Sequence, residues 1–183
     1  MIELLQTNRL RLRRFREVDA PLLFELDRDP EVVRYTGPGH QTVEEYREKI
    51  VSQFLPAYAA HFCRGVFAAE EKNSGDFVGW FILRPSVTYR YAAAVGWFDA
   101  SEIEIGYRFH KRFWGRGLAT EGAIALRDLA FDDAETTAIV ACALTANRAS
   151  TRVMEKLGMT PRYNCELPDG FGTAVIYGMT RVK

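Results

Sequence analysis

The sequence predicts a single α/β domain in which strands and helices alternate along the chain. Three observations support this prediction. The chain has 183 residues, a length that favours one domain, and no stretch rich in Pro, Gly or Ser divides it. Segments with apolar residues at every second position alternate with segments in which they recur at helical spacing. Hydrophobic residues make up 48% of the chain and charged residues 26%, which is typical of globular proteins and argues against disorder, collagen and coiled coils.

Near the N-terminus we expect a strand followed by a helix. Residues 9–13 alternate Arg and Leu, as in a half-buried strand. We interpret the arginines as a solvated strand face rather than as a patch for RNA or phosphate. Asp19-Ala20-Pro21 should start a helix, with Asp as the cap and Pro in the first turn. Its inward residues should be Leu22, Leu23 and Leu26.

A second helix and a hairpin should follow. Thr42-Val43-Glu44-Glu45 fits a capping box at the start of a helix, and Pro56 should end or kink that helix. Strands over 64–70 and 77–83 should flank a hairpin turn at 72–76, which contains Asn, Ser, Gly and Asp.

The second half should hold a long loop and further alternating elements. Residues 85–101 are rich in Ala, Tyr and Trp and lack periodicity, and a loop of this length often covers a binding site. We expect a strand over Glu102–Phe109, a helix from about Leu118 to Phe131, and then a nearly all-apolar central strand over 137–144. A helix over 148–157 should follow and end at Gly158. Two final strands should flank the turn Pro168–Gly170.

Charge and cysteine content exclude several function classes. Lys plus Arg and Asp plus Glu each total 24, and a chain without net positive charge is a poor non-specific nucleic-acid coat. Cys63, Cys142 and Cys165 form no C-x-x-C pair, and none of the three histidines lies at ligand spacing from them. We therefore expect no metal site and no disulfide, but reduced thiols in a cytoplasmic protein. No apolar stretch fits a signal peptide or a membrane span.

The segment Trp114–Thr120 carries the strongest chemical signal. It joins a strand to a helix, and its glycines, Gly115 and Gly117, allow a tight turn and close backbone approach to a ligand. The first helical N–H groups lack intrahelical partners and the helix dipole favours anions, so the segment predicts a phosphate cradle. A Rossmann site would need a third glycine where Thr120 stands, and a Walker loop would need Gly-Lys-Ser/Thr. A tight turn with no ligand is the remaining alternative.

Several motifs in a fixed order make the chain resemble the GNAT N-acetyltransferase superfamily. In particular it resembles the branch related to ribosomal-protein N-terminal acetyltransferases, the RimJ/RimL-like branch. The resemblance covers nearly the whole chain. The motifs are Thr7-Asn8-Arg9-Leu10-Arg11-Leu12-Arg13, Glu104-Ile105-Gly106-Tyr107, Trp114-Gly115-Arg116-Gly117-Leu118-Ala119-Thr120-Glu121, Asn147-x-x-Ser150 and Glu155-Lys156-Leu157-Gly158-Met159.

The resemblance implies a fold and a co-substrate. The fold would be a mixed, mostly antiparallel sheet of about six to seven strands flanked by about four helices, splayed open after the strand 102–109. Acetyl-CoA would be the co-substrate, without a metal, and its pantetheine arm would pair with that strand. The family pattern Gln/Arg-x-x-Gly-x-Gly/Ala falls on Trp114-x-x-Gly117-x-Ala119, with Trp departing at the first position. The implied cofactor-binding residues are Tyr107, Phe109, Trp114, Gly115, Arg116, Gly117, Leu118, Ala119, Thr120 and Asn147.

The resemblance also implies direct acetyl transfer to a primary amine in a ternary complex. Such a transfer needs a neutral amine, a donor to the oxyanion and a proton for the thiolate. Glu104 is the candidate base, acting through water, and Glu102 on the same strand face is the alternative. Ser150 is the candidate acid, because Met154 stands where many members of the superfamily have a tyrosine. Asn147 would bind the pantetheine arm or cap the helix, and the cysteines would have no nucleophilic role.

The sequence leaves the acceptor and two alternative functions open. The acceptor could be a protein N-terminus, a polyamine, an antibiotic amine or another small amine. Its pocket should draw on the first two helices, the loop 85–101 and the final hairpin. The alternatives are a non-catalytic acyl-CoA-binding module and, less well supported, an RNA-binding module that uses residues 9–16. We expect a monomer or a homodimer, with no membrane partner.

Overall fold

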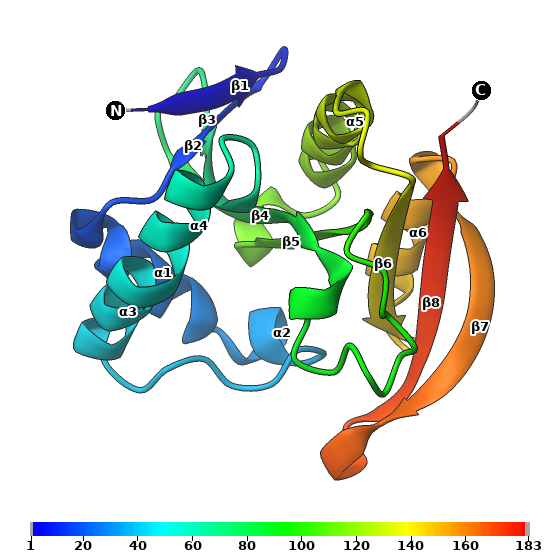
Figure 1. The fold of residues 1–183 in the computed structure, drawn as a ribbon. Coiled ribbons are helices and arrows are strands. Elements are labelled where there is room, and N and C mark those ends of the chain that lie inside the picture. The colour runs from blue at the N-terminus through cyan, green and yellow to red at the C-terminus, as the bar shows by residue number, and fades with distance from the viewer. Residues whose placement is uncertain (1, 182–183) are drawn as a thin grey trace. The chain divides into compact units, whose positions relative to one another are not determined.

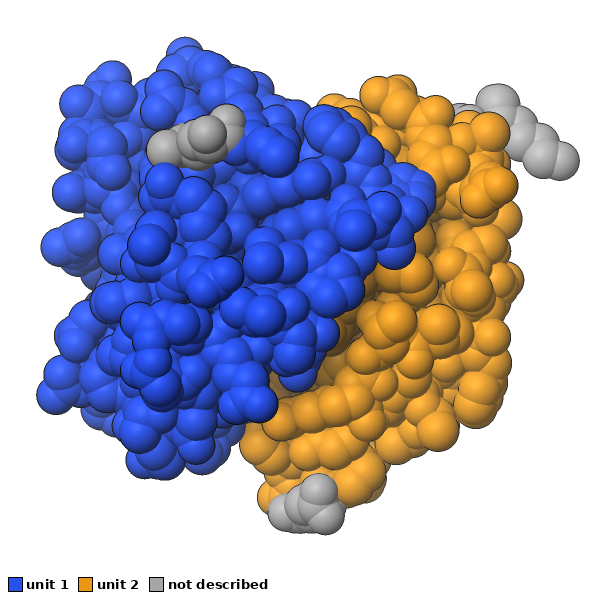
Figure 2. Space-filling model, turned by 60° about the vertical axis from the view of Figure 1, so that its left-hand side comes forward, with its two compact units in different colours: residues 1–82, 107–122 blue, residues 83–106, 123–183 orange. Residues whose placement is uncertain are grey.

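A computed structural model of the chain describes residues 2–181, apart from the side chain of Asp169. These residues divide into two compact units, shown in blue and orange in Figure 2. Unit 1 consists of residues 1–82 and 107–122, and unit 2 of residues 83–106 and 123–183.

The strands follow the order β1-β2-β3-β4-β5-β6-β8-β7 (Figure 1). β4 (Phe77–Pro85) and β5 (Glu102–Phe109) run through both units. Unit 1 therefore holds the strands from β1 to the end of β5, and unit 2 holds the start of β5 with β6, β8 and β7. The expected α/β architecture with a mixed sheet is confirmed, with eight strands among the described residues instead of six or seven.

The N-terminal strands of unit 1 are antiparallel. β1 (Glu3–Gln6) pairs with β2 (Leu10–Arg14), and β2 pairs with β3 (Gly65–Glu71). β1 is a strand that the sequence analysis did not predict. The hairpin between β3 and β4 was predicted, and its turn is closed by the N–H of Glu71 donating to the carbonyl of Asp76 over 2.9 Å.

The solvated arginine face expected for β2 is wrong for Arg13. Leu12 and Arg13 are both buried, and the Arg13 side chain is only 2% exposed. Its guanidinium donates to Asp19 over 2.6 and 3.1 Å and to Glu70 over 2.6 Å. Burying a charge is costly unless it is paired, and these two carboxylates compensate it.

The helices of unit 1 lie between β2 and β3 in the chain. They are α1 (Ala20–Asp27), α2 (Pro30–Val33), α3 (Val43–Lys49) and α4 (Leu55–Ala60). The capping box at Thr42 is confirmed: the Glu45 N–H donates to Oγ1 of Thr42 over 3.2 Å, and the Thr42 N–H donates to the Glu45 carboxylate over 3.0 Å.

The structure corrects the side-chain cap expected for α1 and one of the two outcomes expected at Pro56, the end of the helix. Asp19 precedes α1 but its side chain does not cap the helix, because its carboxylate is engaged by Arg13 and Arg16. Pro56 does not end the second helix. A π-helical segment, Ile50–Phe54, links α3 to α4. Pro56 lies in the first turn of α4, where a helix tolerates a residue that has no backbone N–H.

The strands β5 to β8 of unit 2 pair both in parallel and antiparallel. β6 (Ala138–Leu144) pairs in parallel with β5 and antiparallel with β8 (Gly172–Thr180), which also pairs antiparallel with β7 (Thr160–Leu167). The β5–β6 ladder covers only Glu102–Glu104 against Ala138–Val140, although both strands continue. The sheet is therefore splayed beyond this ladder, as expected.

The two remaining helices follow β5 and β6 in the chain. α5 (Leu118–Asp132) begins in unit 1 and continues in unit 2, and α6 (Arg148–Lys156) lies wholly in unit 2. α6 ends close to the predicted boundary, with Gly158 at a φ of 86°, the left-handed conformation typical of a helix C-terminus.

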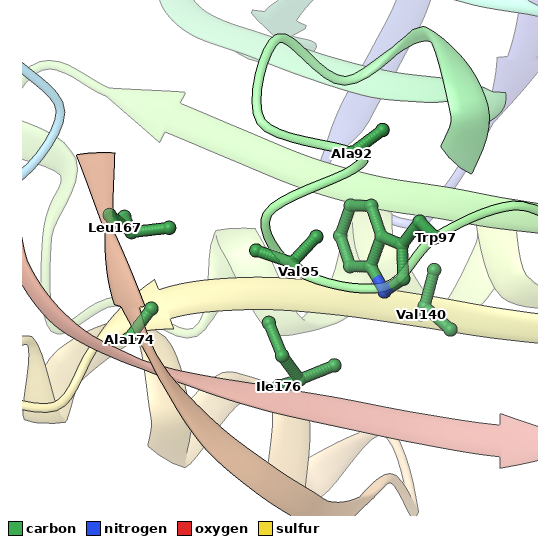
Figure 3. Close-up of a cluster of buried hydrophobic side chains, with 7 residues drawn as sticks. All are labelled: Ala92, Val95, Trp97, Val140, Leu167, Ala174 and Ile176. Carbon is green, nitrogen blue, oxygen red and sulfur yellow. The ribbon is translucent and has the colours of Figure 1, made fainter.

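The loop 86–101 packs part of its length into the core of unit 2. Trp97, only 2% exposed, and Val95 lie in a cluster with Val140 of β6 and Ile176 of β8, as Figure 3 shows. The rest of that buried cluster is Ala92, Leu167 and Ala174. This segment is thus an ordered part of the hydrophobic core, whereas Phe98 beside it is exposed.

Candidate functional site

The turn before α5 has the conformation that an anion cradle requires. Gly115 and Gly117 have φ angles of 72° and 77°, in the left-handed region that favours glycine. The Glu121 N–H donates to the carbonyl of Gly117 over 3.0 Å, which makes the first turn of α5. The N–H groups of the residues from Leu118 to Thr120 precede this bond, so they have no acceptor within the helix.

The side chains of the turn point to different partners. The Leu118 side chain is buried, so only its backbone is available to a ligand, whereas Gly115 and Gly117 are exposed. The guanidinium of Arg116 is ion-paired with Glu71 and lies over the Phe113 ring, 5.3 Å from its centroid. The predicted cradle therefore consists of backbone donors.

Trp114 anchors the turn to the end of β5. Its indole Nε1 donates to the carbonyl of Phe109 over 2.7 Å, while about half of the residue is exposed. The Phe109 side chain is buried against Phe81, with ring centroids 5.1 Å apart. Tyr107 is half-buried, and its ring centroid lies 6.3 Å from that of Phe81. Phe109 can therefore face a ligand only through its backbone, and its carbonyl is already occupied.

Sequence reasoning missed three residues that surround this turn. Thr7 Oγ1 donates to the Glu121 carboxylate over 2.5 Å, and the Arg9 backbone N–H and Nε donate to the same carboxylate over 2.8 and 2.6 Å. Burial alone would raise the pKa of Glu121, but these hydrogen bonds and the Arg9 charge outweigh it and lower the pKa. Thr7 and Arg9 lie in the Thr7–Arg13 motif, and Glu121 ends the Trp114–Glu121 motif. Membership of these motifs was the sequence signal that could have identified them.

In unit 2, the candidate base Glu104 is buried and ion-paired. Its side chain is 9% exposed, and its Oε2 accepts from Arg84 Nε over 2.6 Å. The guanidinium of Arg84 also lies 6.0 Å from the centroid of the Tyr89 ring. The alternative, Glu102, is more exposed and pairs with Arg162 over 3.0 Å. Arg84 fixes one oxygen of Glu104 and leaves Oε1 as the atom that could accept a proton or a water molecule.

Asn147 and Ser150 lie together at the start of α6. Asn147 is the N-cap, and its Oδ1 accepts from the Ser150 N–H over 3.2 Å. The capping role considered for Asn147 is thus present, and its amide nitrogen is the group left for a ligand. Met154, one turn further along, is buried, and its thioether cannot donate a proton.

The cysteines and the clusters of titratable side chains were also candidates for chemistry. None of the three cysteines forms a disulfide, and burial raises the pKa of Cys142 to about 12. Among the described residues, no group of His, Cys, Asp and Glu is arranged to hold a metal ion. In the same part of the chain, no helix combines the length and apolar character needed to cross a bilayer.

Comparisons with known proteins agree with this geometry. A protein-family model described as "Acetyltransferase (GNAT) domain" matches residues 9–160. The chain is also similar to the FsC-acetyl coenzyme A-N(2)-transacetylase of Aspergillus fumigatus, with 28% identity over 156 residues. That match covers 85% of this chain but only 64% of the fungal protein.

Two solved structures share the fold. The aminoglycoside acetyltransferase AAC(6')-Ib in complex with coenzyme A aligns with a TM-score of 0.74 and 24% identity, covering 94% of this chain and 95% of that one. The ribosomal-protein-S5-alanine acetyltransferase of Vibrio fischeri aligns with a TM-score of 0.76 and 14% identity, covering 98% and 97%. At these identities the likeness concerns the fold.

Proposed function

This chain belongs to the GNAT acetyltransferase family and is an acyltransferase that uses acetyl-CoA, and we propose that it moves the acetyl group directly to a primary amine in a ternary complex. One observation supports this most strongly. The left-handed glycines Gly115 and Gly117 present the free N–H groups at the start of α5, which suits a diphosphate. Direct transfer is favoured because the partly buried Cys142 thiol, whose pKa is raised to about 12, is a poor nucleophile at neutral pH.

The proposed binding residues divide into those for the diphosphate and those for the pantetheine arm. The N–H groups from Gly115 to Thr120, flanked by Trp114, would hold the diphosphate. The backbone of β5 around Tyr107 and Phe109 is proposed for the pantetheine arm, and the amide nitrogen of Asn147 is proposed as a further ligand group.

Glu104 is the proposed base. An ammonium acceptor must lose a proton before it attacks the thioester, and Glu104 offers Oε1 for this step, directly or through water. Arg84 would keep the carboxylate in one orientation. Ser150 would then protonate the departing thiolate, since Met154 has no proton to give.

The acceptor is proposed to be a primary amine of a small molecule or of a protein N-terminus. The named relatives act on different amines: one is an aminoglycoside acetyltransferase and another acetylates the alanine of a ribosomal protein. The Thr7–Arg13 motif supports membership of the RimJ/RimL-like branch.

We also propose one catalytic domain over residues 1–183, in the cytoplasm. The family model begins in unit 1 and ends in unit 2, so one domain family spans both. Reduced thiols would persist in that compartment.

The test is amine-dependent release of free CoA from acetyl-CoA, followed with a thiol reagent. The panel should include an aminoglycoside, spermidine and a peptide with an N-terminal alanine. Gly117→Glu should abolish CoA binding, because it fills the turn and places a carboxylate beside the diphosphate. Calorimetry that gives an unchanged CoA affinity for this variant would contradict the assignment.

The two proton-transfer roles predict different signatures. Glu104→Gln should lose most activity at low pH, where the free amine is scarce, and recover partly as pH rises. Ser150→Ala should lower kcat with little change in the KM for acetyl-CoA. Solvent can replace either group in part, so we expect losses of about 100-fold, the low end for acid–base catalysis. Native rates for both variants across the pH profile would refute the roles.

A second candidate function is a non-catalytic acyl-CoA-binding module. Two observations favour it: Met154 cannot donate a proton, and Glu104 is already ion-paired with Arg84. It predicts tight CoA binding without CoA release for any amine in the panel, whereas the enzyme releases CoA with at least one of them.

A further inference from the structure

We propose that Arg9 binds the diphosphate of acetyl-CoA through its Nη2 amino group. This inference rests on the proposed function, because it assumes that the diphosphate lies on the turn before α5. Arg9 lies between β1 and β2, more than 100 residues from that turn along the chain, so only the folded structure brings the two together.

The geometry fixes the Arg9 guanidinium beside the turn. Nε donates to the Glu121 carboxylate over 2.6 Å, and Nη1 donates to the backbone carbonyl of Arg116 over 2.9 Å. A Cβ atom placed on Gly117 would lie 3.5 Å from Nη2. The structure gives Nη2 no hydrogen-bond partner among the described residues, so two held bonds aim a third, unused donor group at the backbone of Gly117.

Charge also assigns this role to Arg9. Glu121 lies in the first turn of α5, and an uncompensated carboxylate there would repel a diphosphate. Arg9 pairs with that carboxylate and still has donors left, because a guanidinium carries five N–H groups in a planar fork. A lysine at this position would keep the charge, but its single nitrogen would have to make all three contacts, whereas the guanidinium presents a separate nitrogen to the carboxylate, the carbonyl and the anion.

Two polar side chains of the turn itself already have partners. The Arg116 guanidinium is paired with Glu71, and the Trp114 indole N–H donates to the Phe109 carbonyl. Arg9 is a cation that two side-chain hydrogen bonds hold against the turn, with its side chain 41% exposed and open to a ligand.

The experiment measures the dissociation constants of coenzyme A and of 3′-dephospho-coenzyme A by calorimetry. The variants are Arg9→Met, Arg9→Lys and, as a matched control, Arg11→Met. Arg11 lies on the adjoining strand, has a 42% exposed side chain and pairs with Glu3, so its removal makes the same change in net charge. Melting temperatures show whether each variant is folded.

We expect Arg9→Met to weaken both ligands about tenfold or more, as for the loss of a charge-assisted hydrogen bond. Arg9→Lys should be intermediate, and Arg11→Met should bind like the native protein. Equal losses for both ligands support a diphosphate contact. A loss that disappears with dephospho-coenzyme A would mean that Arg9 contacts the 3′-phosphate, and would overturn the proposal.

Glu121→Gln separates binding from mere support of the turn. The glutamine keeps one carbonyl oxygen for the hydrogen bonds from Thr7 and the Arg9 backbone N–H, but its amide group cannot also accept from Arg9 Nε, and the negative charge is gone. If Arg9 binds the ligand, this variant should bind CoA at least as tightly as the native protein. If Arg9 only holds the turn, Glu121→Gln should weaken CoA binding in parallel with Arg9→Met, and the proposal fails. Failure of the native protein to bind CoA would instead refute the proposed function.

Discussion

Replacing Gly117 with alanine tests whether the conformation of the turn before α5 determines CoA binding. Gly117 has a φ of 77°, and an added Cβ would meet only Arg9 Nη2, at an ordinary contact distance of 3.5 Å. The cost is therefore conformational. A left-handed non-glycine residue costs about 1–2 kcal/mol, and the reduced freedom of the unfolded chain returns about 0.4–1 kcal/mol. The net loss is about 1 kcal/mol, which lowers the melting temperature by about 2–4 °C in a chain of this length.

Gly75 provides a matched control. It has a φ of 75° with nothing within 4 Å of the added Cβ, and it lies in the β3–β4 hairpin. Gly75→Ala should therefore lose the same stability, measured by thermal unfolding, and leave CoA affinity unchanged. Gly117→Ala should in addition weaken CoA about tenfold, because relaxation toward negative φ redirects the N–H groups of the turn. Equal CoA affinities in the two variants would refute the argument.

Three further predictions concern buried groups. Arg13→Met should lower the free energy of unfolding by about 3–5 kcal/mol in urea titrations, because it leaves the carboxylates of Asp19 and Glu70 unpaired; a loss below about 1 kcal/mol would contradict the buried pair. Burial alone would raise the pKa of Asp19, but hydrogen bonds from Arg13 and Arg16 lower it. The ionised Asp19 carboxylate should contribute fully to stability above its pKa in the unfolded chain, about 3.9. This contribution should be lost as the pH falls through its lower pKa in the folded protein. Asp19→Asn should therefore flatten the dependence of stability on pH below about pH 4. Cys142→Ala should keep turnover, since a thiol with a pKa of about 12 is protonated at neutral pH, and mass spectrometry should find no acetyl-cysteine in quenched reactions.

The sequence predicted the elements whose signals are local. Alternation over 102–109 identified β5, and the Thr42–Glu45 box marked the start of α3, because each signal is contained in a few consecutive residues. β1 and α2 were missed because each is only four residues long, too short for a period to appear. The burial of Arg13 depends on Glu70, 57 residues away, and no local pattern carries that information.

The candidate site divides in the same way. The role of Gly115 and Gly117 was predictable because both glycines lie in the turn that they form, so the signal is local. The ion pair of Glu104 with Arg84 and the contact of Arg9 with Glu121 were not, because each joins residues whose proximity depends on strand pairing or helix packing. Sequence alternation placed Arg9 on a strand face but could not say which carboxylate lies opposite.

The contact between Arg9 and Glu121 has a consequence for how the protein is made. The two residues are 112 positions apart, and unit 1 is built from two separate stretches of chain, 1–82 and 107–122. During synthesis the N-terminal strands leave the ribosome long before the residues that complete their unit, and closing a loop of this size costs entropy before any contact forms. A nascent chain stalled at residue 110 would carry Arg9 without its acceptors. Competence to bind the nucleotide should therefore appear late in translation, after residue 121 has emerged.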